Sequence, residues 1–554
     1  MSQNTNFLLR SHLGYPAALI LFTLLLTGCA GNSEIRIPPS PQNPTVISSK
    51  EARIKADLGP KDYYDSIEPY LTKPGLDHVM KATAPMPFVH QTAYIEFDEQ
   101  GDFLDRRQLL AALDDQLPVY QSQKRFLIFY AHGWQNNSRS RDVAMFNRFI
   151  GHLNEALGQA CDAKKVGRWT VYGVYLSWRG TNFQPVDYVE PHHDQDKPIE
   201  VKTDPVLYGP VSLVKPFTFW SRKAAANRFA GAPLMETIQS LSNKVRVKNT
   251  VPGVTLTRSV LMGHSFGAYI IEKTLLQSMA SEEGPYGSKS ITPPADLVVL
   301  LNSAAPAIYA KEFIDFMKWH QIEKESTQAT AFLPVTTATD PYWKRPFIVS
   351  ITSESDLATK DVFPVGTLPE GLFDVGSYEG KESIAYNGAN QKKFFTHTPG
   401  HCDFIVSHDL VPAAEIPKKV PFTSQGDDWI LQYNLYAFHK DLHPDDLDVS
   451  KEYPMKQNEV ILWGNKGYAK AGKKADDPDK RNEPAADPQL WKLQLSRYDE
   501  GHCGYNNTPY WIIRVPKQVI SDHGDVWNPN TASLIAGLYR MAGLLVADSD
   551  SSKP

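Results

Sequence analysis

The strongest indication of the fold comes from Ser259-Val260-Leu261-Met262-Gly263-His264-Ser265-Phe266-Gly267. Its apolar start leads into glycines placed two residues before and two residues after Ser265, and residues 268–276 continue with the apolar spacing of a helix. This order predicts a tight strand-to-helix corner, because such a corner leaves no room for side chains at its flanks. Ser265 would then stand out at the end of a sheet. For the pentapeptide alone, an ordinary turn serine is the alternative.

Apolar runs alternate with helical patterns on both sides of this corner. Runs that are typical of strands buried on both faces occupy residues 126–131, 169–178, 256–262, 297–301 and 347–351. Helical spacing is found in residues 144–157 and, with an interruption, in residues 217–241. Strands that alternate with helices predict the α/β class, with a mainly parallel sheet covered on both faces.

The amino terminus has the features of an export signal. The apolar stretch 15–26 is too short to cross a bilayer, and it ends in Leu26-Thr27-Gly28-Cys29, which resembles the lipobox of bacterial lipoproteins. We therefore expect a signal peptide over residues 1–28, a lipidated Cys29 and a flexible tether over residues 29–50. An ordinary signal peptide with an incidental cysteine is the alternative. A cell-envelope lipoprotein is expected, and Ala30 favours the outer membrane, facing the periplasm or the cell surface.

Charge and cysteine content limit the possible partners. The formal net charge of −5 over 554 residues is mild, and it argues against strong affinity for nucleic acid. Apart from Cys29, the cysteines are Cys161, Cys402 and Cys503. We predict a disulfide between Cys402 and Cys503, since Cys161 falls near the end of an expected helix. The two His-Cys pairs, His401-Cys402 and His502-Cys503, lie too far apart in the sequence for a zinc signature, so no metal site is predicted.

The order of these parts resembles the α/β-hydrolase superfamily, in which an oxyanion-hole loop is followed by a serine elbow, an acid and finally a histidine. The likeness covers roughly residues 90–360 and 509–548, and it is closest to uncharacterised bacterial lipoprotein members. It implies an α/β-hydrolase fold, with a mostly parallel sheet, helices on both faces and no cofactor.

The resemblance also implies roles for particular residues. Ser265 would be the nucleophile, and His132-Gly133-Trp134 follows strand 126–131, where the family places its oxyanion loop. The backbone amides of Trp134 and Phe266 would then form the oxyanion hole.

The acid and the base follow later strands. Asp356 lies several residues past the strand that ends near residue 351, which is where the family acid is found, and Glu354 is the alternative acid. His523 lies between an expected last strand, 510–516, and an expected closing helix, 531–545, and would be the general base.

An insertion over residues 361–508 separates the acid from the base, and it divides the expected core into residues 51–360 and 509–548. Possible strands in it are residues 429–433, 460–463 and 493–495. Because it leaves from the carboxyl end of the sheet, where the site is expected, we predict that it forms a lid or a subsite.

These features together predict an envelope-anchored serine hydrolase, esterase- or lipase-like, that cleaves a carboxylic ester through an acyl-enzyme. The partners expected are an ester or lipid-like substrate and the membrane that holds the lipid anchor. A thioesterase, an amidase or a phospholipase would use the same residues. A non-catalytic binding protein on the same fold is the alternative outside enzymes.

Overall fold

The computed structural model describes most of the chain between residues 92 and 544. The described residues are 92–113, 124–134, 136, 138, 142–143, 145–146, 149–150, 153, 169–180, 218–247, 257–283, 294–327, 346–371, 388–415, 459–463, 488–495, 508–542 and 544. The expected signal peptide and tether lie outside them. Within these ranges, no helix combines the length and the apolar character needed to cross a membrane.

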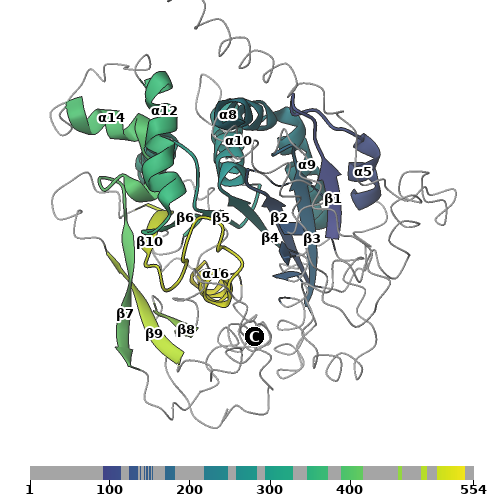
Figure 1. Ribbon diagram of the computed structural model, residues 1–554. Coiled ribbons are helices and arrows are strands. Elements are labelled where there is room, and N and C mark those ends of the chain that lie inside the picture. The colour runs from purple at the N-terminus through teal and green to yellow at the C-terminus, as the bar shows by residue number, and fades with distance from the viewer. Residues whose placement is uncertain are drawn as a thin grey trace, which may run out of the picture.

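The fold is built on a ten-stranded sheet with the strand order β1-β3-β2-β4-β5-β6-β10-β7-β9-β8 (Figure 1). Along this order, all pairs of neighbouring strands from β1 through β10 to β7 are parallel. By contrast, β9 pairs antiparallel with both β7 and β8. The bounds are β1 (Thr92–Glu96), β2 (Lys124–Ala131), β3 (Trp169–Ser177), β4 (Thr257–His264), β5 (Leu297–Leu301), β6 (Ile348–Ser353), β7 (His408–Glu415), β8 (Glu459–Trp463), β9 (Pro488–Leu495) and β10 (Tyr510–Val515). The prediction of a mostly parallel α/β sheet is confirmed.

Helices cover both faces of this sheet because its central strands are apolar on both sides. Successive side chains of a strand point to opposite faces, so Phe129 packs in one buried cluster and Ile128 in another. Each such fully buried side chain stabilises the fold by roughly 1.5–3 kcal/mol. In Figure 1, α8 and α10 lie on one side of the sheet and α16 on the other. The first cluster is covered by α8 (Thr218–Phe229), α9 (Ala232–Val247), α10 (Phe266–Glu283) and α11 (Ala307–Thr327), the second by α16 (Pro529–Met541).

The start of the described chain is not the hairpin that its two apolar runs, residues 93–97 and 103–104, would predict. Residues 93–104 have the pattern of a hairpin, but residues 92–96 form β1, which pairs parallel with β3 at the sheet edge. Of the hairpin, the structure contains one isolated antiparallel bridge, between Phe97 and Phe103. Pairing with the long buried β3 provides more ladder hydrogen bonds than a short isolated hairpin does. Helix α5 (Arg106–Ala111) follows.

The described strands of the predicted insertion extend the central sheet. β7 pairs parallel with β10, and β9 and β8 continue beyond it. Between β6 and β7 lie η6 (Ala358–Val362), α12 (Phe363–Gly371), α14 (Gly388–Thr396) and η7 (Pro399–His401). The possible strand 429–433 lies outside the described residues. A lid or subsite role for this range stays a prediction.

Cys402 does not agree with the predicted disulfide. It is a free thiol with no exposed surface, packed in the first core cluster, and burial raises its pKa to about 12. A thiol in this apolar setting behaves as a small hydrophobic side chain. Its predicted partner, Cys503, lies outside the described residues, as does Cys161.

We expect Cys402 to resist alkylation in the native protein, because the thiol is buried and stays protonated at neutral pH. After unfolding without reductant, Cys402 should become fully alkylated. Peptide mass spectrometry measures both states, and a Cys402 peptide joined to Cys503 or Cys161 would contradict the free thiol.

Candidate active site

The corner at Ser265 is as tight as its glycines predict. Ser265 joins β4 to α10 with a φ of 56°, in the left-handed region that side chains other than glycine rarely adopt. A Cβ added to Gly267 would lie 2.0 Å from the Ala131 carbonyl oxygen, and one added to Gly263 would lie 2.7 Å from Ala268 Cα. Both glycines are therefore required by contact with backbone.

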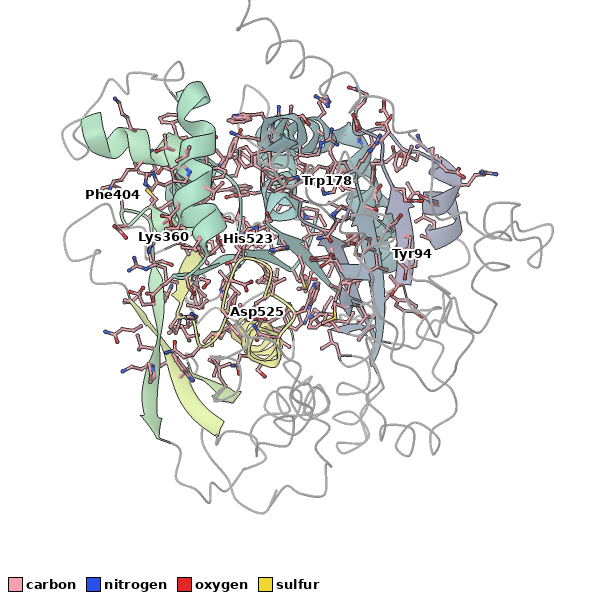
Figure 2. All side chains as sticks on the ribbon, in the orientation of Figure 1. Tyr94, Trp178, Lys360, Phe404, His523 and Asp525 are labelled. Carbon is pink, nitrogen blue, oxygen red and sulfur yellow. The ribbon has the colours of Figure 1, made fainter. Side chains whose placement is uncertain are left out.

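Three side chains from distant parts of the chain meet at this corner. His523 Nε2 lies 2.8 Å from Ser265 Oγ, and His523 Nδ1 lies 2.8 Å from Asp356 Oδ2. His523 stands in the loop between β10 and α16, near the middle of the view in Figure 2, with its side chain 28% exposed. The structure thus brings together the three residues to which the resemblance gave catalytic roles.

The direction of each hydrogen bond follows from the state of Asp356. Burial by itself would raise the pKa of Asp356, but hydrogen bonds from His523 and Thr359 outweigh burial and hold this pKa below its usual range. An ionised carboxylate only accepts, so His523 carries its proton on Nδ1. Nε2 is then unprotonated and accepts the Ser265 hydroxyl.

Every side of the Asp356 carboxylate is occupied. Oδ1 accepts the amides of Ala358 and Thr359 at 3.0 and 3.1 Å, and Oδ2 accepts the Thr359 hydroxyl at 2.6 Å. His401 in turn places Nε2 3.2 Å from the Thr359 hydroxyl oxygen. Since that hydroxyl gives its proton to Asp356, His401 donates to it. These bonds leave the carboxylate one orientation, facing His523.

Glu354, the alternative acid, is exposed, and the hydrogen-bond partner of His523 Nδ1 is Asp356 instead. Its backbone amide bonds to the Val515 carbonyl, which continues the pairing of β6 with β10. The geometry therefore favours Asp356 as the partner of the histidine.

The loop after β2 lies directly against Ser265. A Cβ added to Gly133 would come within 3.0 Å of Ser265 Cβ, so the glycine allows this close approach. Trp134 follows Gly133, and Phe266 opens helix α10, whose first amides have no acceptor within the helix. Among the described residues, none accepts a hydrogen bond from either amide. Both predicted oxyanion donors thus lie near the serine without an acceptor in the described part of the chain.

His132 fixes the shape of this loop. Its Nδ1 donates to the Gly133 carbonyl at 2.9 Å, and its Nε2 accepts the Trp178 amide at 3.2 Å. The Trp178 indole nitrogen donates back to the His132 carbonyl at 2.8 Å. Burial lowers the pKa of His132 to about 4, so the ring is neutral at pH 7 and suits this donor and acceptor pattern.

Several residues of the site were not predicted from the sequence. Thr359 orients the acid, and Asn302 contacts the base loop from the end of β5. A polar residue directly after a buried strand is the signal that points to Asn302, because the carboxyl ends of parallel strands meet at one edge. In the described part of the chain, no group of three or more His, Cys, Asp or Glu side chains is placed to hold a metal ion.

Comparisons with protein-family models and with curated proteins gave no match. Among solved structures, the chain is similar to one described as the crystal structure of an uncharacterized protein from Pseudomonas aeruginosa. The two share 15% identity, and the match covers 45% of this chain and 38% of that chain, with a TM-score of 0.18. The chain therefore matches well under two thirds of that protein's length. At this TM-score the similarity supports no inference about fold or function.

We expect Gly267→Ala to destabilise the protein by roughly 1–3 kcal/mol or more, because its Cβ has no space beside the Ala131 carbonyl. Gly524→Ala is the matched control, since a Cβ there would meet only Asp522 Oδ1 at 3.7 Å. Denaturant unfolding compares the two variants. Equal stabilities would contradict the tight corner.

Proposed function

We propose that this chain is a serine hydrolase of the α/β-hydrolase superfamily, which cleaves a carboxylic ester through an acyl-enzyme. The observation that carries the proposal is the continuous hydrogen-bond path from Ser265 through His523 to a buried Asp356, with both bonds at 2.8 Å. A serine is a weak nucleophile unless a neighbouring base accepts its proton, and this arrangement supplies the base and its orienting acid.

In the first half of the proposed reaction, Ser265 Oγ attacks the ester carbonyl carbon and its proton passes to His523 Nε2. The carbonyl oxygen gains the negative charge, and the amides of Trp134 and Phe266 stabilise it by donating hydrogen bonds to it. Two such donors are typically worth several kcal/mol of barrier. The positive end of helix α10 adds to this field, because Phe266 is its first residue. The alcohol leaves with the proton from His523.

In the second half, water attacks the acyl carbon while His523 Nε2 takes one of its protons. The acyl–Oγ bond breaks, the proton returns to Ser265 Oγ, and the carboxylic acid leaves. Asp356 stays ionised throughout and stabilises the imidazolium that forms in each half. Its depressed pKa suits this role.

The proposal includes the location of the enzyme. The lipobox-like sequence ending at Cys29, together with the apolar stretch before it, supports an envelope lipoprotein. Lipids, acylated glycans and other esters that reach the envelope are then the substrate classes available to the site.

A fluorophosphonate probe should label the wild type and leave Ser265→Ala unlabelled, because the probe reacts with a serine activated by a base. Ser303→Ala is the matched control, since Ser303 is also buried near the end of the sheet but only accepts the Ala305 amide. Labelling is measured by mass spectrometry of the intact chain. Equal labelling of Ser265→Ala and wild type would remove Ser265 from the proposed role.

Asp356→Asn should lower kcat for ester hydrolysis by about 10⁴-fold with little change in KM, because an amide favours the wrong imidazole tautomer. The amide would also face the Thr359 hydroxyl and His523 Nδ1, which are both donors. Glu354→Gln is the control, and its kcat should stay close to that of the wild type. A severe Glu354→Gln with a tolerated Asp356→Asn would move the acid to Glu354.

A further inference from the structure

The backbone carbonyl of His523 accepts two side-chain hydrogen bonds that the proposed reaction does not use. His264 Nε2 lies 2.8 Å from this oxygen, and Asn302 Nδ2 lies 3.1 Å from it. Asn302 Nδ2 also lies 3.3 Å from the Asp522 carbonyl oxygen. Because a carbonyl oxygen only accepts, both side chains donate. The main chain at the proposed base is thus held by groups from two different strand ends.

Asn302 connects this base loop to the strand that carries the acid. Its Oδ1 accepts the backbone amide of Ser353, three residues before Asp356, at 3.0 Å. The backbone amide of Asn302 donates to the Ile351 carbonyl at 2.8 Å. The side chain has no exposed surface. Removal of the side chain would therefore take away the protein partners of these buried backbone groups.

The backbone on both sides of Asn302 is bound to the nucleophile corner. In the described part of the chain, Ser265 and Asn302 are the residues other than glycine with positive φ, at 56° and 44°. The Ser265 amide donates to the Leu301 carbonyl at 3.0 Å, and the Ala304 amide donates to the Ser265 carbonyl at 3.1 Å. Such conformations persist where the surroundings fix them, and they gather at functional sites. One asparagine thus joins the nucleophile corner, the acid strand and the base loop.

His264 is suited to a supporting role beside the base. Burial, followed by repulsion from His523, lowers the pKa of His264 to about 3, so the ring is neutral at pH 7. Its Nδ1 has no partner among the described residues, which leaves the Nε2 bond to orient the ring. The two rings lie 5.0 Å apart. A neutral neighbour at this distance adds no positive charge against the imidazolium that forms on His523.

We propose that Asn302 and His264 are positioning residues that hold the main chain of His523, and through it the imidazole, in line with Ser265 and Asp356. This inference rests on the proposed function, because it assigns the two residues to the base of that reaction. A displacement of about 1 Å at a reacting group can cost on the order of 10²-fold in rate. Side-chain rotation alone cannot correct a shift of the residue's own backbone.

Asn528 is a matched control for Asn302, because it can distinguish an effect on the position of His523 from an effect on stability alone. Asn528 is also buried, and its Nδ2 donates to two loop carbonyls, those of Val519 and Asp525, at 2.9 and 2.6 Å. Its Oδ1 accepts the Thr531 amide at 2.9 Å. Asn528 therefore has the same set of bonds as Asn302 and stabilises the same loop, but it does not touch His523.

The test compares Asn302→Gly with Asn528→Gly in the purified full chain. Glycine accepts the positive φ of residue 302, so Asn302→Gly removes the side chain without adding backbone strain. A second pair compares His264→Leu, which removes the donor, with His264→Gln, whose amide nitrogen can take the place of Nε2. The measurements are the melting temperature, kcat and KM for a p-nitrophenyl ester, and the low-field proton NMR resonance of His523 Nδ1–H.

We expect Asn302→Gly to lower kcat on the order of 10–100-fold with KM within about twofold of the wild type. Its low-field resonance should weaken or vanish, because the ring no longer faces Asp356. Asn528→Gly should lower the melting temperature by a similar amount but keep kcat within about twofold and retain the resonance. His264→Leu should lower kcat by about tenfold, and His264→Gln should recover most of the loss.

Equal kcat values for Asn302→Gly and Asn528→Gly, or an unchanged low-field resonance in Asn302→Gly, would overturn the positioning role. Failure of the proposed function looks different, since the wild type itself would then not hydrolyse the ester. The resonance does not depend on turnover, and it therefore tests the hold on His523 in that case as well.

Discussion

The hydrogen bond between His523 Nδ1 and the buried Asp356 carboxylate is the interaction on which the rest of the site depends. A buried carboxylate is stable as an ion only when donors surround it, and Thr359, the Ala358 amide and His523 supply them. Because that carboxylate only accepts, it fixes which imidazole nitrogen carries the proton. Nε2, which faces Ser265, is then able to accept the hydroxyl proton. Asp356 therefore acts on Ser265 only through His523.

The parallel sheet explains how residues so far apart in sequence come together. Asp356 follows β6, Ser265 follows β4 and His523 follows β10, and in a parallel sheet these carboxyl ends lie along one edge. Asn302 follows β5, which lies between β4 and β6. Its side chain therefore spans the gap between two functional loops. The strand order sets which residues can meet, and the loop hydrogen bonds set their final geometry.

The sequence was a good guide wherever local rules decide the structure. The apolar run before Ser265 and the glycines beside it require one kind of corner, and no distant residue can change that requirement. Placing Asp356 and His523 needed the order of strands as well, which the resemblance supplied. The sheet edge formed by β7, β9 and β8 was not foreseen, because pairing between strands far apart in sequence leaves no local pattern. The free thiol of Cys402 was missed for the same reason, since only the fold shows it to be buried.

We propose that Ser265 carries the acyl group during ester hydrolysis. The most direct test of this proposal is to mix the protein with excess p-nitrophenyl ester, quench with acid during turnover, and map the acyl group by peptide mass spectrometry. We expect an acylated peptide that spans residues 263–267, with the added mass on Ser265. Turnover of the ester with the acyl group on another residue, or with no acylated peptide while release of the acyl group is rate-limiting, would contradict it.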